Sequence, residues 1–138
     1  MATTPITYQT DLDYVDWSAM RAILIADDFD NGRSVEQYER SFKNSAVACI
    51  AYDDGQIIGT ARALSDGVCN AYIVDVWTYR PYRGRGIART MIQHLLNRLP
   101  GQHVYLFTDD VPEFYRKIGF QERGIGLEIV VGHWLVNQ

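Results

Sequence analysis

The stretch from Ala71 to Leu99 constrains the fold more than any other part of the chain. It opens with the apolar run 71–79, typical of a buried strand, and closes with 87–99, where apolar side chains recur at helical spacing. Between them stands Arg83-Gly-Arg-Gly-Ile-Ala88. A turn of this kind at a helix start offers free main-chain N–H groups to an anion, and the helix dipole adds positive potential. We therefore predict a strand–turn–helix unit that binds a phosphate-bearing molecule.

The distribution of charge around this turn supports the same prediction. The chain carries a net charge of −4, yet residues 76–108 contain no Asp or Glu and five arginines, so this window is +5 and the rest is −9. Focused positive potential on an acidic protein attracts a small polyanion, although arginines gathered by chance on a solvated face are the alternative. The acidic total argues against nucleic acid as a partner.

Length and composition bound the class of protein. With 138 residues, 47% of them hydrophobic, the chain suits a single domain over 1–138. Apolar runs fall well short of the ~18 residues of a membrane span, and residues 1–5 lack the pattern of a signal peptide. The two cysteines and three histidines lack metal-ligand spacing. We expect a cytoplasmic protein without a membrane partner and without a metal.

The remaining patterns predict an α+β domain. Strands are expected at 6–9, 46–52, 57–64, 68–79 and 104–107, with a final strand or two in 126–134. Helices are expected at 16–26, 34–42, 87–99 and 111–118, and Ser34 and Gln37 have the spacing of a capping box at the start of the second. Three consecutive strands joined by short turns make a mostly antiparallel sheet, and the crossover helix 87–99 implies one parallel pair.

Two motifs in this order are similar to those of the GNAT superfamily of acyl-CoA N-acyltransferases. The turn 83–88 matches that family's Gln/Arg-x-x-Gly-x-Gly/Ala signature. The run Phe114-Tyr-Arg-Lys-Ile-Gly-Phe120 resembles its second hallmark, an aromatic pair followed by polar residues and Gly-Phe. Asn70-Ala-Tyr-Ile-Val-Asp-Val76 is further similar to the plastid and cyanobacterial branch of arylalkylamine (serotonin-type) acetyltransferases.

The resemblance implies a GNAT-like fold and acetyl-CoA as co-substrate. The fold would be a mixed, mostly antiparallel central sheet of six to seven strands flanked by about four helices, with strands four and five splayed. The pyrophosphate of coenzyme A would lie on the loop and helix start formed by Arg83, Gly84, Arg85, Gly86, Ile87 and Ala88. The pantetheine arm would follow the main chain of Val76, Trp77 and Thr78, where a free N–H would also stabilise the oxyanion.

Two side chains are candidates for proton transfer. Asp75 is a carboxylate within an apolar strand, where burial would raise its pKa and make it a base for the incoming amine, directly or through a water. The alternative for Asp75 is a structural carboxylate satisfied by backbone donors or by an arginine such as Arg62. Tyr115 matches the family tyrosine that protonates the departing thiolate, and a packing tyrosine is its alternative.

The expected acceptor is a small-molecule primary amine. Residues 1–40 contain eight acidic side chains against three arginines, and in related folds the first two helices wall the acceptor pocket. An acidic wall favours a cationic amine, and a solvated acidic face is the alternative. Aromatic lining would come from Tyr14, Trp17, Phe29, Tyr72, Trp77 or Tyr79.

The resulting hypothesis is an N-acetyltransferase in which the amine attacks acetyl-CoA directly in a ternary complex. The alternative is a non-catalytic acyl-CoA-binding or sensing domain of the same fold. A third possibility, an RNA-binding module built on the Arg-Gly turn, conflicts with the acidic composition. The chain is expected to be a monomer or a homodimer, the latter through pairing of residues 127–134 across a dimer.

Overall fold

The computed structural model describes residues 5–135. The prediction that residues 1–5 are not a signal peptide falls mostly on residues 1–4, which lie outside the described residues. The chain divides into two compact units, one up to Tyr105 and one from Leu106, which are described separately below. Among residues 5–135, no helix is long and apolar enough to cross a membrane.

The first unit contains a five-stranded sheet in the order β1-β2-β3-β4-β5. The strands are β1 (Thr7–Gln9), β2 (Val47–Asp53), β3 (Gln56–Ser65), β4 (Asn70–Thr78) and β5 (His103–Tyr105). The first four pair antiparallel, whereas β4 and β5 pair parallel. The parallel pair follows from the helical crossover between these two strands, because a parallel connection has to return to the same end of the sheet. The predicted mixed, mostly antiparallel sheet is therefore confirmed.

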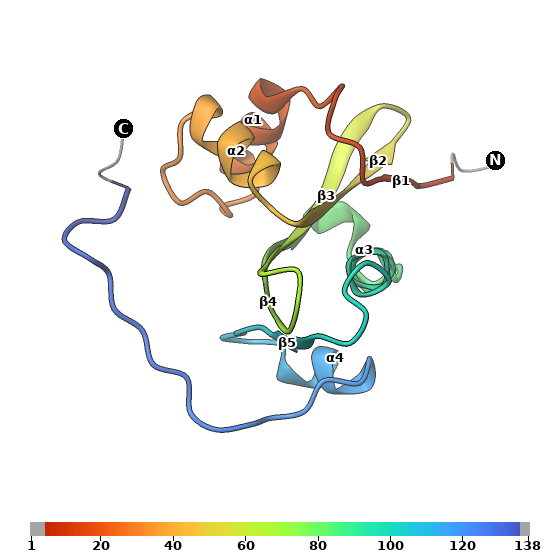
Figure 1. Cartoon of the computed structure of the whole chain (residues 1–138). Coiled ribbons are helices and arrows are strands. Elements are labelled where there is room, and N and C mark those ends of the chain that lie inside the picture. The colour runs from red at the N-terminus through yellow and green to blue at the C-terminus, as the bar shows by residue number, and fades with distance from the viewer. Residues whose placement is uncertain (1–4, 136–138) are drawn as a thin grey trace. The chain divides into compact units, whose positions relative to one another are not determined.

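Three helices of the first unit cover the two faces of the sheet. They are α1 (Trp17–Ala26), α2 (Val35–Lys43) and α3 (Ile87–Leu96), with α1 and α2 together on one side and α3 on the other (Figure 1). Asp16 caps α1 by accepting from the N–H of Ala19, and Ser34 with Gln37 forms the expected capping box of α2. These caps fix where both helices begin, as the sequence predicts.

The core lies on both faces of the sheet. Under α1 and α2, a cluster of buried side chains joins the helices to β2, β3 and β4, and it comprises Trp17, Met20, Leu24, Tyr38, Phe42, Ala48, Ile50, Ile57 and Trp77. On the other face, α3 buries Ile87, Met91, Ile92 and Leu95. Burial of each such side chain stabilises the fold by about 1.5–3 kcal/mol. The packing therefore holds α3, and with it the first turn of this helix, in a fixed position on the sheet.

The second unit contains the helix α4 (Pro112–Lys117), whose first position is a proline that needs no hydrogen-bonded N–H. The prediction of a final strand at 126–134, and with it a sheet of six to seven strands, is wrong: 120–135 form no strand in the described chain. Apolar residues do alternate there, but Ile125, Leu127 and Ile129 are 87–89% exposed. Alternation alone cannot make a strand, because a strand also needs a neighbour for its main-chain groups.

Candidate functional site

The loop between β4 and α3 has a conformation that only glycine adopts readily. A short 3-10 turn, Arg80–Tyr82, leads into it, and Gly84 and Gly86 then have φ angles of 81° and 78°. A Cβ built on either glycine meets nothing within 4 Å, so the constraint is the backbone conformation and not the space. Most other residues would pay about 1–2 kcal/mol at such angles. The two glycines of the sequence motif are therefore required by the path of this loop.

The loop leaves a row of main-chain donors open. Gly86 is the N-cap of α3 and offers no side-chain cap, and the first helical bond runs from Thr90 N to Gly86 O at 3.1 Å. Within residues 5–135, no acceptor receives the N–H groups of residues 84–88. These groups lie at the positive end of the α3 dipole. Main-chain donors in this arrangement suit an anion, and the role of the loop as an anion-binding site stays a prediction.

The five arginines of the acid-free window differ in what they contact. Arg83 donates from Nε to the Thr78 carbonyl at 3.0 Å, and its Nη2 lies 3.2 Å from Asp27 Oδ2. Arg98 is turned to the hydroxyl of Thr10 at 2.9 Å. The remaining three are Arg80, 3.9 Å from Asp27; Arg85, over the ring of Tyr82; and Arg89, which has no polar partner recorded in the described chain. Arg85 and Arg89 are therefore the cations left for a bound anion.

The end of β4 is the expected path of the pantetheine arm. Pairing with β5 covers only Asn70–Tyr72, so residues 73–78 have no partner in β5. Trp77 is 2% exposed, and its Nε1 donates to Asp27 Oδ2 at 2.8 Å. The hydroxyl oxygen of Thr78 is buried and has no hydrogen-bond partner in the described chain. A buried, unpaired hydroxyl is costly, and a ligand that hydrogen-bonds it would remove that cost.

A β-bulge interrupts β4 just before this segment. Thr60 of β3 is opposite Trp77 and Arg62 is opposite Val74, so residues 75 and 76 share one partner on β3. Asp75 has a φ of 57°, in the left-handed region, and its carbonyl accepts from the hydroxyl of Thr60 at 2.9 Å. Asp is one of the few side chains that tolerate this region. The bulge turns the main chain of residues 75–76 out of the regular ladder.

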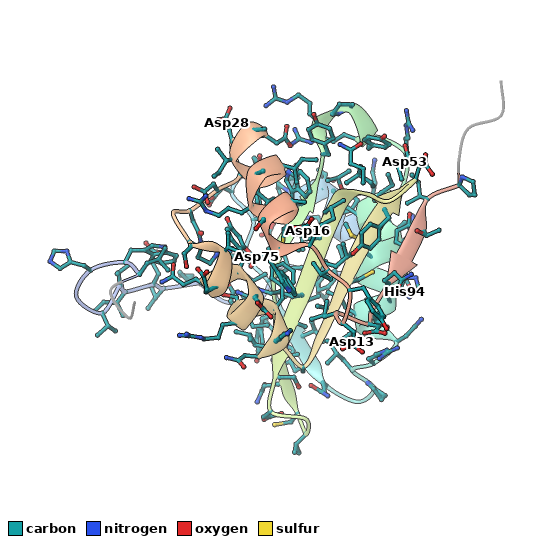
Figure 2. The ribbon with its side chains drawn as sticks, turned by 90° about the horizontal axis from the view of Figure 1, so that it is seen from above. Asp13, Asp16, Asp28, Asp53, Asp75 and His94 are labelled. Atoms are coloured by element: carbon teal, nitrogen blue, oxygen red, sulfur yellow. The ribbon has the colours of Figure 1, made fainter. Side chains whose placement is uncertain are left out.

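Figure 2 labels Asp75, whose carboxylate is held by two arginines. Arg33 donates from both terminal nitrogens, at 3.0 Å and 2.8 Å, and Arg62 donates from Nε at 2.6 Å. Burial by itself raises the pKa of Asp75, but the hydrogen bonds and charges of Arg33 and Arg62 together outweigh it, so the pKa is lowered. The expectation of a raised pKa for Asp75 is therefore wrong, because the partners Arg33 and Arg62 together outweigh the effect of burial.

Arg33 is a residue of the candidate site that the sequence did not indicate. It lies in the connection between α1 and α2, where its Nε donates to Asn31 Oδ1 at 2.9 Å and its guanidinium lies 4.3 Å from the centre of the Tyr38 ring. The main-chain oxygen of Arg33 accepts from Arg21 Nε at 2.9 Å. Its pairing with Asp75 joins residues 42 positions apart. The sequence signal was limited to an arginine directly before the Ser34 cap.

Tyr115 lies in the second unit, on α4. It is buried, and its ring makes edge-on contacts with Phe114 and Phe120 at centroid distances of 5.0 Å and 5.9 Å. Burial raises the pKa of the Tyr115 hydroxyl, and the negative charge of Asp110 raises it further. The hydroxyl therefore stays protonated at neutral pH, as a proton donor must.

The aromatic residues expected at an acceptor site differ in where the structure places them. Trp17 and Trp77 belong to the core, whereas Tyr14 and Tyr79 line a cleft of about 480 Å³ between α1 and the β2–β3 hairpin, together with Asp16. The cleft includes no residue of the loop 83–88. Among residues 5–135, no group of three or more His, Cys, Asp or Glu is placed to hold a metal ion.

Comparison with known proteins matches residues 13–120 to the Acetyltransferase (GNAT) family. "Histone acetyltransferase TAP1" of Glycine max is 38% identical over 77 residues, covering 53% of this chain and 33% of the relative. "Serotonin N-acetyltransferase 2, chloroplastic" of Oryza sativa is 30% identical over 96 residues, covering 64% and 48%. The chain thus spans a third to a half of these relatives' length. A Clostridium acetobutylicum structure described as a predicted acetyltransferase with acetyl-CoA has a TM-score of 0.69 and 25% identity, covering 91% of this chain and 96% of that one.

Proposed function

The chain belongs to the GNAT family of acetyltransferases, and from this premise we propose that it transfers the acetyl group of acetyl-CoA to a primary amine within a ternary complex. One observation carries the proposal. The loop 83–88 presents a row of unpaired N–H groups at the start of α3, with both glycines in left-handed conformations. An anion of the size of a pyrophosphate matches such a row of donors.

The proposed donor site runs from this loop along the end of β4. The pyrophosphate would accept from the main chain of residues 84–88, with Arg85 and Arg89 adding charge. The pantetheine arm would lie along Val76, Trp77 and Thr78, where β4 has no β5 partner and the Thr78 hydroxyl is unpaired. Arg83 supports the proposal less directly, because its guanidinium is already bonded to Asp27 and Thr78.

The proposed reaction needs two proton transfers. The neutral amine attacks the thioester carbonyl, its nitrogen–carbon bond forms, and a main-chain N–H near Val76 stabilises the oxyanion. The intermediate then breaks its carbon–sulfur bond, the nitrogen loses one proton, and the departing thiolate takes one proton from the Tyr115 hydroxyl, which solvent reprotonates. The raised pKa of Tyr115 keeps that proton in place until the thiolate forms.

The role of Asp75 as the base stays a prediction, and the geometry favours its alternative. Both carboxylate oxygens already accept from guanidinium groups of Arg33 and Arg62, and the lowered pKa makes the carboxylate a weaker base. We favour a structural role in which Asp75 holds the bulge that directs Val76 toward the thioester. The proton of the amine would then leave through water.

For the acceptor we propose a cationic primary amine. The names of the relatives include one histone and one serotonin acetyltransferase, so a lysine side chain and an arylalkylamine are the first two classes to test. The acidic first forty residues favour either cation over an acidic substrate. That the chain is one catalytic domain, cytoplasmic, and monomeric or homodimeric stays a prediction.

The non-catalytic alternative, an acyl-CoA-binding or sensing domain, is kept because of Asp75. Asp75 is one of the two side chains expected to transfer protons, and its ion pairs with Arg33 and Arg62 make it less available as a base. Such a domain would bind acetyl-CoA and yet release no thiol with any amine, so a turnover assay separates the two functions.

The decisive experiment measures release of free thiol from acetyl-CoA with serotonin, a lysine-containing peptide and a polyamine. We expect turnover with at least one amine. Tyr115→Phe should lower kcat by about 10²–10⁴-fold while the Kd for coenzyme A changes less than about twofold. Tyr8→Phe, on the edge strand β1 and outside the proposed donor and acceptor sites, is the matched control and should leave kcat unchanged. Binding of acetyl-CoA without thiol release in the wild-type protein would favour the sensing domain.

A further inference from the structure

Asp27 is a buried carboxylate at an unfavourable place. It is the residue that follows α1, and its main-chain N–H donates to the Ile23 carbonyl at 3.0 Å. The side chain is only 5% exposed. A carboxylate at the C-terminal end of a helix faces the negative end of the dipole, and a buried charge needs compensating partners. Its partners therefore indicate why this position carries an acid.

The partners of Asp27 come from the end of β4 and from the loop that follows it. Oδ2 accepts from Trp77 Nε1 at 2.8 Å and from Arg83 Nη2 at 3.2 Å. Arg83, in turn, donates from Nε to the Thr78 carbonyl at 3.0 Å. One oxygen of Asp27 thus joins α1, the strand that would hold pantetheine and the first residue of the anion-binding loop.

These contacts fix the loop from one side. Arg83 stands directly before Gly84, where the chain enters the left-handed conformation that opens the N–H groups of the loop. With its guanidinium tied at both ends, Arg83 restrains the backbone at that entry point. A loop held in its binding conformation before the ligand arrives loses less entropy when the ligand binds.

We infer that Asp27 is a positioning residue for acetyl-CoA, acting through Arg83 and Trp77 on the loop 83–88. This inference rests on the proposed function and deepens it. Arg83 then serves as a brace within the protein, and the charge that meets the phosphates comes from Arg85 and Arg89. The same bond links the loop to α1, one of the helices expected to wall the acceptor site.

The neighbouring residue provides a matched control. Asp28 follows Asp27 at the same end of α1, is exposed and has a φ of 58°, which asparagine also tolerates (Figure 2). Asp27→Asn can keep one oxygen for Trp77 Nε1 and Arg83, but it removes the negative charge that pairs with Arg83 and puts an N–H₂ group in the place of Oδ1, which lies 3.9 Å from Arg80 Nε. Asp28→Asn removes one charge nearby and breaks no recorded contact, so it controls for long-range electrostatics.

The test measures the Kd of coenzyme A by calorimetry and kcat by thiol release for both variants. We expect Asp27→Asn to raise the Kd by about tenfold, the scale of one charge-assisted hydrogen bond, with kcat at saturating acetyl-CoA within about twofold of wild type. Asp28→Asn should change neither. An unchanged or lower Kd in Asp27→Asn would overturn the inference. Wild-type protein that binds no coenzyme A would overturn the proposed function itself.

A second variant, at Arg83, tests the same contact if Asp27→Asn does not fold. Arg83→Gln alters a side chain that is 52% exposed and should fold. It should raise the Kd as much as Asp27→Asn does, the double variant should add little further, and the salt dependence of binding should stay that of wild type. A weakened salt dependence in Arg83→Gln alone would show that Arg83 contacts the phosphates directly, which contradicts the brace.

Discussion

Two neighbouring sites, one on β4 and one in the loop that follows it, differ in whether their polar groups are hydrogen-bonded within the protein. At the bulge of β4, the carboxylate of Asp75 is bonded by Arg33 and Arg62, and its carbonyl is bonded by Thr60. Past the end of the same strand, the N–H groups of residues 84–88 have no acceptor in the described chain. The polar groups of the first site are paired within the protein, and the donors of the second are open to the ligand that we propose.

The comparison distinguishes Asp75, which has the residue type of a catalytic base, from the loop 83–88, which we propose as the binding site. The carboxylate of Asp75 stands out in the sequence because it lies in an apolar strand, yet both of its oxygens are already bonded to Arg33 and Arg62. The glycine turn offers little side-chain chemistry, yet its backbone is the part left open. A residue type in the sequence therefore does not show whether its polar atoms are available for catalysis or binding, because this depends on their hydrogen-bond partners in the fold.

The largest effect should come from breaking the satisfied site. Asp75→Ala leaves Arg33 and Arg62 buried without their shared anion and places alanine at a φ of 57°. We expect a loss of about 3–5 kcal/mol in the free energy of unfolding, measured with urea. Asp75→Asn, which tolerates this φ, should lose less. A loss under about 1 kcal/mol in Asp75→Ala would mean that the two ion pairs do not hold the bulge.

The pH dependence of stability sharpens the same point. Since the pKa of Asp75 is lowered by folding, its ionised form stabilises the protein above the pKa of the unfolded chain, near 4. This stabilisation is lost as the pH falls through the lower folded pKa. The difference in unfolding free energy between wild type and Asp75→Asn should therefore be full at pH 7 and shrink below pH 4. A difference that grows with acidity would contradict the lowered pKa.

The open site should respond to a smaller change in a different observable. Gly86→Ala should cost about 1–2 kcal/mol of stability, because alanine is strained at a φ of 78°. Gly67→Ala is a matched control, with the same φ and an equally open Cβ position in the turn before β4. Both variants should lose similar stability, but only Gly86→Ala should lose affinity for coenzyme A. Equal affinity in the two would remove the loop from the donor site.

The smallest effect on stability is expected at the exposed arginines. Arg85→Gln and Arg89→Gln should each change the unfolding free energy by less than about 0.5 kcal/mol, while each weakens coenzyme A binding several-fold and flattens its salt dependence. Arg98→Gln is the control, because that side chain is bonded to Thr10. If Arg85→Gln and Arg89→Gln lowered the unfolding free energy but left the affinity for coenzyme A unchanged, these arginines would not be part of the donor site.

Local features of the fold were accessible from the sequence, and long-range partners were not. The start of α3 at Ile87 and the capping box at Ser34 depend on residues within a few positions, so the pattern predicts them directly. The bulge at Asp75 and its pairing with Arg33 depend on contacts far apart in the chain. The wrong final strand has the same cause, since 126–134 have the alternation of a strand but no partner among the described strands.

The candidate site divides in the same way. The loop 83–88 was predicted as an anion site from its glycines, its arginines and the helix that follows, and the structure gives it open donors. That Arg83 is tied to Asp27 could not be read from the sequence, because these residues are 56 positions apart. The sequence thus indicates which main-chain segment is the candidate for binding, and the structure shows which neighbouring arginines are not paired with an acid.

The most direct test of the contrast is a backbone amide NMR titration of the wild-type protein with coenzyme A. The account predicts that the largest shifts fall on the amides of residues 84–88, with further shifts at Val76–Thr78, while the backbone amides of Arg33 and Arg62 stay in place. Shifts centred on Asp75 and its arginines, with the amides of 84–88 unmoved, would contradict it.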